Sequence, residues 1–164
     1  MKLRMLFLSI LFISFATQGF SQDFSKLENI PLKEKADFSN AEKQVLECAN
    51  YLVSKPLDIN DENRDFAERF LFAWMTGSPD YTFNIDEKVG KIVELNNSLL
   101  GIYLGYATKI ALEDKAKSLN GIQLTNKAIS MLLDYCKNPD NKVAINESLK
   151  KIIDENNGAS YQKL

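Results

Sequence analysis

Histidine is absent from all 164 residues, and cysteine occurs only twice, as Cys48 and Cys136. Without histidine the chain cannot build a Ser-His-Asp or Cys-His catalytic group or a histidine-based zinc or iron site. Two cysteines are also too few for a four-thiolate zinc site. The seven glycines form neither a phosphate-binding loop nor a dinucleotide fingerprint. We therefore expect no metal and no cofactor.

Long apolar runs are confined to the N-terminus. Residues 1–21 begin with the basic Lys2 and Arg4 and continue into an apolar stretch over residues 6–16, which small and polar residues follow. This order predicts a signal peptide that is cleaved before Gln22. An uncleaved membrane anchor is the alternative, but spanning a bilayer takes about 20 apolar residues. We expect the mature chain to be periplasmic or secreted, and to have no membrane attachment after cleavage.

The chain carries little excess charge of either sign. Its 20 Lys and Arg residues and 22 Asp and Glu residues give a net charge of −2. Loss of Lys2 and Arg4 with the signal peptide makes this about −4. A mildly acidic surface repels phosphate backbones, and no basic patch is interleaved with aromatic residues. Nucleic acid is therefore not an expected partner.

An even number of cysteines in an exported chain favours a disulfide, here between Cys48 and Cys136. Closing so long a loop would stabilise the fold by about 4 kcal/mol in the chain-entropy model. The alternative is two buried free thiols.

Apolar residues recur at helical spacing along most of the chain. We predict an all-α protein with one domain, an orthogonal bundle of five to six helices over residues 38–157. A loosely ordered leader over residues 22–37 precedes this domain, and a flexible tail over residues 158–164 follows it. A capping box at Ser39 and Glu42 predicts the start of the first helix. The residues that we expect in the core are Phe66, Phe70, Trp74, Leu104 and Leu132.

Two further segments carry helix signals. Residues 98–112 have a single charged side chain, Lys109, which predicts a helix at the centre of the bundle. Gly101 and Gly105 lie four residues apart in it and would let another helix pack closely. Farther along the chain, Asn138 and Pro139 predict the N-cap and the first residue of the last helix.

Aromatic residues are concentrated between Phe70 and Phe83. Helical spacing places Phe72 on the side of its helix opposite Trp74. A turn at residues 77–80 then leads into residues 81–83, which we call the strap and expect to lie across the helices. The residues that we predict as a partner or ligand surface are Phe72, Asp80, Tyr81 and Phe83.

Acidic residues offer one enzymatic alternative. Residues 58–65 alternate oxygen ligands as a calcium loop does, but Asn63 stands where that loop needs glycine and Arg69 where it needs glutamate. We therefore interpret these acids as the start of a helix. A carboxylate pair such as Asp80 and Asp86 could still act as acid and base. The alternative function is a small enzyme or a small-ligand-binding protein with an apolar pocket lined by aromatic and acidic residues.

Two segments in the second half of the chain carry a family resemblance. Residues 99–107, L-L-G-I-Y-L-G-Y-A, and residues 120–142, N-G-I-Q-L-T-N-K-A-I-S-M-L-L-D-Y-C-K-N-P-D-N-K, resemble two successive helices of the HdeA family. That family comprises periplasmic acid-stress chaperones, and its wider circle includes immunity proteins that neutralise type VI secretion effectors. The positions of Cys48 and Cys136 depart from the family's cysteine placement. Residues 72–83 have no counterpart there and look like part of a family of small secreted bacterial helical proteins.

The resemblance implies a non-enzymatic protein that works by contact with a protein partner or client. One implied role is a stress chaperone that binds unfolded clients when protonation of carboxylates loosens its packing. The other is an immunity or adaptor protein that presents a rigid helical face to one partner.

Overall fold

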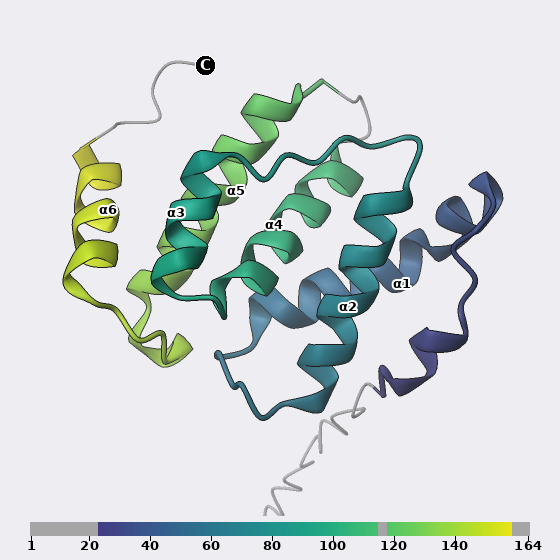
Figure 1. Ribbon diagram of the computed structural model, residues 1–164, viewed down its shortest axis with the longest axis horizontal. Coiled ribbons are helices and arrows are strands. Elements are labelled where there is room, and N and C mark those ends of the chain that lie inside the picture. The colour runs from purple at the N-terminus through teal and green to yellow at the C-terminus, as the bar shows by residue number, and fades with distance from the viewer. Residues whose placement is uncertain (1–22, 115–117, 159–164) are drawn as a thin grey trace, which may run out of the picture.

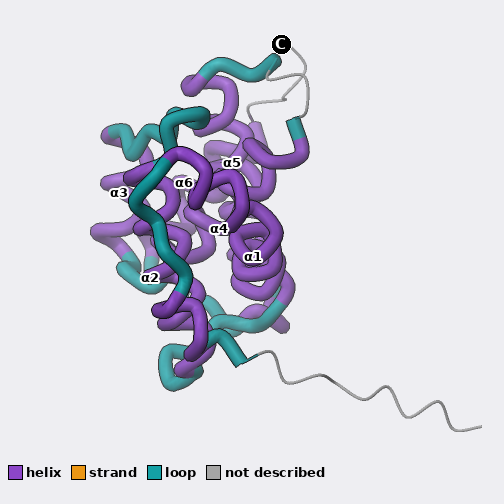
Figure 2. The backbone as a smooth tube through the Cα atoms, turned by 90° about the vertical axis from the view of Figure 1, so that its right-hand side faces the viewer, coloured by secondary structure: helices purple, strands orange, loops and turns teal. Residues whose placement is uncertain are grey.

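The computed structural model describes residues 23–114 and 118–158, which form helices and loops and no strand (Figure 1 and Figure 2). The predicted all-α class is thus confirmed. The predicted signal peptide and residues 159–164 of the predicted tail lie outside the described residues. The helices are α1 (Lys35–Ser54), α2 (Glu62–Gly77), α3 (Glu87–Leu95), α4 (Leu99–Glu113), α5 (Gly121–Lys137) and α6 (Glu147–Gly158), with the 3-10 helices η1 (Ser25–Asn29) and η2 (Pro139–Asn141).

Helix α4 is the centre of the bundle, as its apolar composition predicts. It packs against α1, α2, α3 and α5 (Figure 1). Its one charged side chain before the last turn, Lys109, reaches the edge, where its Nζ donates to Asn50 Oδ1 (2.7 Å) and pairs with Glu113 (3.1 Å). Although α4 is apolar, no helix in the described residues has both the length and the apolar character needed to cross a membrane.

The two glycines of α4 make room for different neighbours. An ideal Cβ on Gly105 would lie 2.8 Å from Val53 Cγ1 and 3.3 Å from the Ala49 carbonyl oxygen, so α1 crosses α4 at this point. A Cβ on Gly101 would instead collide with the carboxyl group of Glu68 on α2. The predicted close approach of a second helix is therefore found at Gly105, whereas Gly101 accommodates a side chain.

Trp74 is the largest fully buried side chain of the described residues. Its Nε1–H donates to the Phe38 carbonyl oxygen (2.9 Å), which ties α2 to α1 and satisfies the indole in the core. Phe70, Leu104 and Leu132 are also buried. Phe66 is partly buried, and the guanidinium of Arg69 lies 5.0 Å from the centroid of its ring.

Helix α1 begins at Lys35, and its N-cap lies five residues before Ser39, where the sequence predicts it. Glu34 is its N-cap, and the Asp37 carboxylate accepts hydrogen bonds from the N–H groups of Glu34 (2.9 Å) and Lys33 (3.0 Å). These two bonds lower the pKa of Asp37. The prediction missed this start because serine is a far commoner N-cap residue than glutamate.

The short helix η1 packs onto the bundle ahead of α1. Phe24 and Leu27 are buried, and the Phe24 ring meets Tyr51 edge-on with centroids 5.1 Å apart. The Phe24 N–H donates to Asn63 Oδ1 at the start of α2 (3.1 Å). Residues before α1 thus add apolar side chains to the core.

The last helix begins later than Asn138 and Pro139 predict. These residues start η2, where Asn138 Oδ1 accepts from the Asp140 N–H (3.0 Å). Lys142 then adopts a left-handed conformation (φ 55°), which ends that turn. Helix α6 begins only at Glu147, where Asn146 Oδ1 accepts from the Leu149 N–H (2.8 Å). Asn146 thus caps α6 with the same kind of hydrogen bond that Asn138 makes in η2, eight residues earlier. The Asn138-Pro139 pair marks the short 3-10 helix and carries no information on where α6 begins.

The predicted disulfide is wrong. Cys48 and Cys136 are free and buried, with 0% and 2% of their surface exposed. Cys48 lies on α1 and Cys136 on α5, and α4 separates these helices (Figure 1). An even cysteine count does not bring two Cα atoms within the roughly 7 Å that a disulfide needs. Burial raises the pKa of the Cys48 thiol to about 12 and of the Cys136 thiol to about 11, so both stay protonated at neutral pH.

Candidate functional site

The strap lies on Trp74. The ring centroids of Tyr81 and Phe83 are 5.3 Å and 5.9 Å from that of Trp74, and both rings are partly buried. The Tyr81 hydroxyl also donates to Glu42 of α1 (3.1 Å). Burial is the main cause of the raised pKa of Tyr81. The strap therefore closes the core at its end of the bundle.

Phe72 does not join the strap. It is 50% exposed and lies two residues before Trp74 on α2, which places it about 200° around the helix from the tryptophan. The structure thus brings Tyr81 and Phe83 together and leaves Phe72 on a separate surface, where helical spacing had put it.

Asp80 and Asp86 have structural partners. The Asp80 carboxylate lies 2.8 Å from the Lys35 ammonium, and Asp86 accepts hydrogen bonds from the first N–H groups of α3 as its N-cap. Asp80 and Tyr81 line a hollow of about 260 Å³ together with Asp114 and several aliphatic and small residues. Tyr81 is the one aromatic residue among those that line it. This hollow differs from the aromatic pocket expected of a small enzyme.

Three loops meet at the end of the bundle opposite the strap, lower in Figure 1. They are residues 55–61 between α1 and α2, residues 96–98 between α3 and α4, and residues 138–146 between α5 and α6. The Leu57 N–H donates to the Asn141 carbonyl oxygen (2.9 Å), which joins the first loop to the third. Segments far apart in the sequence are thereby fixed next to one another.

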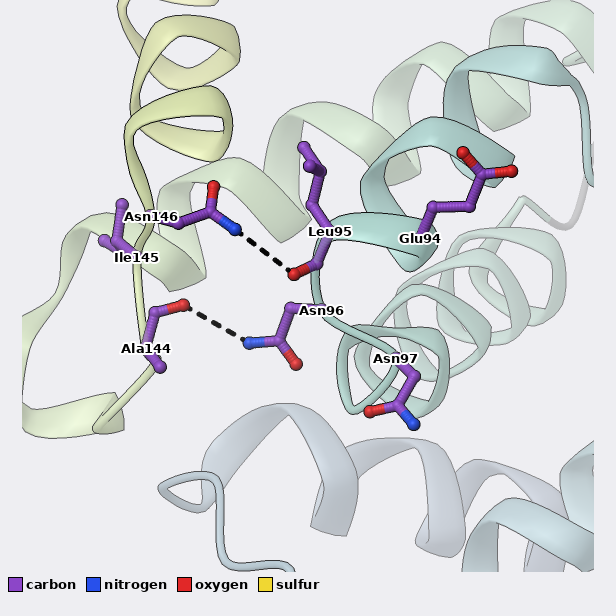
Figure 3. Close-up of a pocket in the computed structure, with 7 residues that line it drawn as sticks. All are labelled: Glu94, Leu95, Asn96, Asn97, Ala144, Ile145 and Asn146. Atoms are coloured by element: carbon purple, nitrogen blue, oxygen red, sulfur yellow. Dashed lines mark hydrogen bonds between the residues drawn. The ribbon is translucent and has the colours of Figure 1, made fainter.

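Two asparagines join the second loop to the third by a reciprocal exchange (Figure 3). Asn96 Nδ2 donates to the Ala144 carbonyl oxygen (3.3 Å), and Asn146 Nδ2 donates to the Leu95 carbonyl oxygen (3.4 Å). The Asn96 side-chain oxygen accepts from the N–H of Ser98, the residue before α4, and the Asn146 oxygen accepts from the Leu149 N–H in the first turn of α6. Both amides therefore cross-link the loops, and that of Asn146 also caps α6.

Three hollows lie side by side along these loops, and together we call them the loop furrow. The first, of about 570 Å³, is lined by residues 94–97 and 144–146 (Figure 3). The middle hollow, of about 240 Å³, shares Asn97 with the first. The third, of about 420 Å³, shares Leu57, Asp58 and Asp61 with the middle one. The shared residues place the three hollows next to one another along the loops.

Arg64 lines the middle hollow although it is only 4% exposed. Its Nη2 donates to the carbonyl oxygens of Leu52 (3.3 Å), Lys55 (3.4 Å) and Pro56 (3.2 Å). A cation suits this place because unpaired carbonyls make the C-terminal end of α1 negative. Tyr135 of α5 adds a further hydrogen bond to the Lys55 oxygen (2.7 Å). Arg64 thus fixes the first loop at the end of α1.

The guanidinium of Arg64 is incompletely satisfied. Its Nε and Nη1 have no hydrogen-bond acceptor among the described residues, although both atoms are buried. Glu68, one turn along α2, is the nearest counter-charge, with its Oε1 3.8 Å from Nη1. That distance is an ion pair and too long for a hydrogen bond.

Glu68 is partly buried between α2 and α4. Its carboxyl group lies over Gly101 of α4, and its side chain is 32% exposed. Burial raises the pKa of Glu68, the Arg64 charge opposes this rise, and the Asp65 charge adds to it. The Glu68 carboxylate is therefore partly desolvated, and Arg64 is its one ion-pair partner among the described residues.

Acidic side chains dominate the middle hollow. Asp58, Asp61, Asp65 and Glu68 line it, against Arg64 as its one basic residue. Lys55 and Lys142 appear only in the third hollow. Two exposed isoleucines lie along the furrow, since Ile59 (79% exposed) lines the middle hollow and Ile145 (44%) the first. The furrow is thus a polar, net acidic depression with apolar side chains at two points.

The furrow offers hydrogen bonds and charge. In the part of the chain that the structure describes, no group of three or more His, Cys, Asp or Glu residues could hold a metal ion. Asp61 is fully engaged, because one oxygen accepts from the Asn63 N–H (3.0 Å) and the other from the Tyr51 hydroxyl (2.7 Å). Burial and this bond raise the pKa of Tyr51 to about 12. The arrangement is therefore suited to binding.

Comparison with protein-family models, with curated proteins and with solved structures gives no match to this chain.

Sequence reasoning placed the acids of residues 58–65 at a helix start but missed Arg64 and Glu68. The spacing contained a usable signal for one of them. Arg64 precedes the buried Ala67 by three residues and the buried Leu71 by seven, so it belongs to the apolar stripe of α2. A charged residue on such a stripe indicates a buried and partnered group. Glu68 lies beside that stripe, and only the position of Gly101 explains its burial.

Proposed function

We propose that this chain is an exported, non-enzymatic helical protein that acts by binding another protein, and that the loop furrow is its contact surface. The observation that carries the proposal is the furrow itself, three adjoining hollows at one end of a packed core with exposed isoleucines among its lining. Loops held on a rigid scaffold are where binding residues concentrate. The predicted signal peptide over residues 1–21 supports export.

Of the two roles that the HdeA resemblance implies, the immunity or adaptor role has the better support. A chaperone needs a broad apolar surface for many clients. The exposed large apolar residues described here are instead divided among separate segments. Ile59 and Ile145 line the loop furrow, Phe72 lies on α2, Ile85 lies in the loop before α3, and Ile122 lies at the start of α5. A polar furrow with hydrogen-bonded walls favours one partner of matching shape and charge.

The alternative of a small enzyme or ligand-binding protein has weaker support. Of its proposed carboxylates, Asp80 forms an ion pair with Lys35 and Asp86 caps the N-terminus of α3. The hollow beside the strap has Tyr81 as its one aromatic lining residue. Turnover of small-molecule substrates that is lost in the Asp80→Asn or Asp86→Asn variant would establish the enzyme instead.

Photo-crosslinking in cells tests the proposal. A benzophenone amino acid is placed at Ile59, in the middle hollow, and separately at Ile122, which is 71% exposed at the start of α5. Both positions are exposed, so neither replacement disturbs the core. We expect a protein adduct of one defined mass from position 59 and none from position 122.

The outcomes separate the parts of the proposal. An adduct from position 122 alone would retain protein binding and reject the furrow as its surface. A ladder of many adducts from both positions would support the chaperone role. No protein adduct from either position, in cells grown with and without acid stress, would reject action by protein contact.

A further inference from the structure

We propose that the middle hollow of the loop furrow binds a lysine or arginine side chain that is carried on an extended segment of the protein partner. This inference rests on the proposed function and adds to it the chemistry of the partner segment. Three properties of the hollow carry it: its charge, an unsatisfied buried donor, and its place in a row of three hollows.

The charge of the middle hollow favours a cation. Asp65 is paired at its rim with Arg69 (3.2 Å), and Asp61 uses both oxygens within the chain. Asp58 spends one oxygen on the Asn60 N–H (3.0 Å), and Glu68 has only the distant ion pair with Arg64. Two carboxylates, the exposed Asp58 and the partly buried Glu68, therefore retain unused acceptor capacity. A lysine ammonium or an arginine guanidinium supplies several donors to such a pair.

Arg64 in the wall of the middle hollow favours an occupant that also offers a neutral acceptor. Its Nε and Nη1 lack acceptors among the described residues, and a buried N–H without an acceptor is energetically costly. A free anion would satisfy these donors but would face four carboxylates. A peptide carbonyl oxygen accepts a hydrogen bond without bringing negative charge. A main-chain segment with a basic side chain meets both requirements at once.

The row of hollows sets the shape of the occupant. The middle hollow shares Asn97 with the first and shares Leu57 and Asp58 with the third, so the three adjoin in a row. An extended chain directs successive side chains to alternate sides and places its carbonyl groups between them. Such a segment can follow the row, whereas a compact ligand would occupy one hollow only. Extended segments bound in this way gain affinity from main-chain hydrogen bonds and specificity from side-chain pockets.

A titration followed by NMR tests the inference on the purified mature chain. The probe is a capped hexapeptide of alternating glycine and lysine, and the matched probe alternates glycine and glutamate. We expect the lysine peptide to shift the backbone amides of Asp58, Glu68 and Asn97, with an affinity that falls as salt is added. The glutamate peptide should leave them in place. A response to both peptides, or shifts spread evenly over the acidic surface, would overturn the inference.

Matched variants show whether the named carboxylates are responsible. Glu68→Gln and Asp58→Asn should each weaken binding of the lysine peptide about fivefold. Glu87→Gln is the control, because Glu87 is an exposed acid of α3 paired with Lys91 (2.7 Å), and binding should be unchanged. Asp58 is exposed in a loop, so its variant keeps the test open if Glu68→Gln fails to fold. Equal effects of all three variants would overturn the inference.

The peptide titration and the crosslinking experiment can fail independently of each other. If position 59 crosslinks a protein partner while the lysine peptide does not bind, the partner chemistry is wrong and the contact surface remains.

Discussion

Gly105 and Gly90 offer an internal comparison that measures how closely α1 and α4 pack. Both glycines lie inside helices. An ideal Cβ on Gly90 has no atom within 4 Å, whereas one on Gly105 would lie 2.8 Å from Val53 Cγ1 and 3.3 Å from the Ala49 carbonyl oxygen. Alanine therefore fits at position 90 and does not fit at position 105.

The two substitutions should change the free energy of unfolding in opposite directions. Gly90→Ala should raise it by about 0.5 to 1 kcal/mol, since alanine loses less backbone freedom on folding. Gly105→Ala has the same gain, but it must push aside Val53 and a backbone carbonyl that cannot rotate away. Overpacking of this kind costs about 1 to 3 kcal/mol. We expect a net loss of about 1 kcal/mol for Gly105→Ala, and about 3 kcal/mol for Gly105→Leu.

Urea unfolding followed by Trp74 fluorescence and by far-ultraviolet circular dichroism measures both effects. Equal slopes in the two variants would show that the change lies in stability and not in the denatured state. The two alanine variants should differ by about 2 kcal/mol, or roughly 4 to 8 °C in melting temperature. If alanine stabilised the protein equally at both positions, α1 and α4 would not meet at Gly105 as described.

Further predictions concern the core and the furrow. Trp74→Ala should lower the free energy of unfolding by about 3 to 5 kcal/mol, and a thermal melt close to that of the parent would contradict its burial. Cys48 and Cys136 should resist a thiol reagent in the native, unreduced protein and both react after unfolding; a protein without free thiols after unfolding would restore the disulfide. Arg64→Met should cost about 2 to 3 kcal/mol in urea unfolding, because three carbonyl oxygens lose their donor, and no loss would mean that water replaces it. The raised pKa of Glu68 means that the folded state binds its proton more tightly than the unfolded state does, so this group's contribution to stability falls as pH rises from its usual pKa of 4.5 through the raised value. Urea midpoints measured across that range should therefore fall more steeply in the parent than in Glu68→Gln, and parallel curves would refute the shift.

Much of the helical framework follows from local sequence. The helices α2 and α4 lie where the sequence predicts them, because acidic residues mark the start of α2 and α4 has an apolar surface nearly all round. Gly105 was recognisable as a point of close packing because a glycine inside an apolar helix leaves space for a neighbouring helix. Phe72 was placed correctly because an α-helix turns about 100° per residue, whatever surrounds it.

Features that depend on distant parts of the chain were not predictable. The cysteine count carried no information on the position of α4 between α1 and α5, which keeps Cys48 and Cys136 apart. The loop furrow forms only when three loops meet, and its hydrogen bonds join residues 48 to 84 positions apart, such as Asn96 with Ala144 and Leu57 with Asn141. The apolar spacing within one segment does not indicate which loops come together in the fold.

The central claim is that the loop furrow receives a basic, extended segment of a protein partner. Mass spectrometry of the adduct formed from the benzophenone at Ile59 tests it most directly, because it identifies the residues of the partner that lie in the furrow. We expect the crosslinked peptide to be one continuous segment with a lysine or arginine within a few residues of the crosslink. An acidic segment, or an amphipathic helix with no basic residue near the crosslink, would contradict the claim.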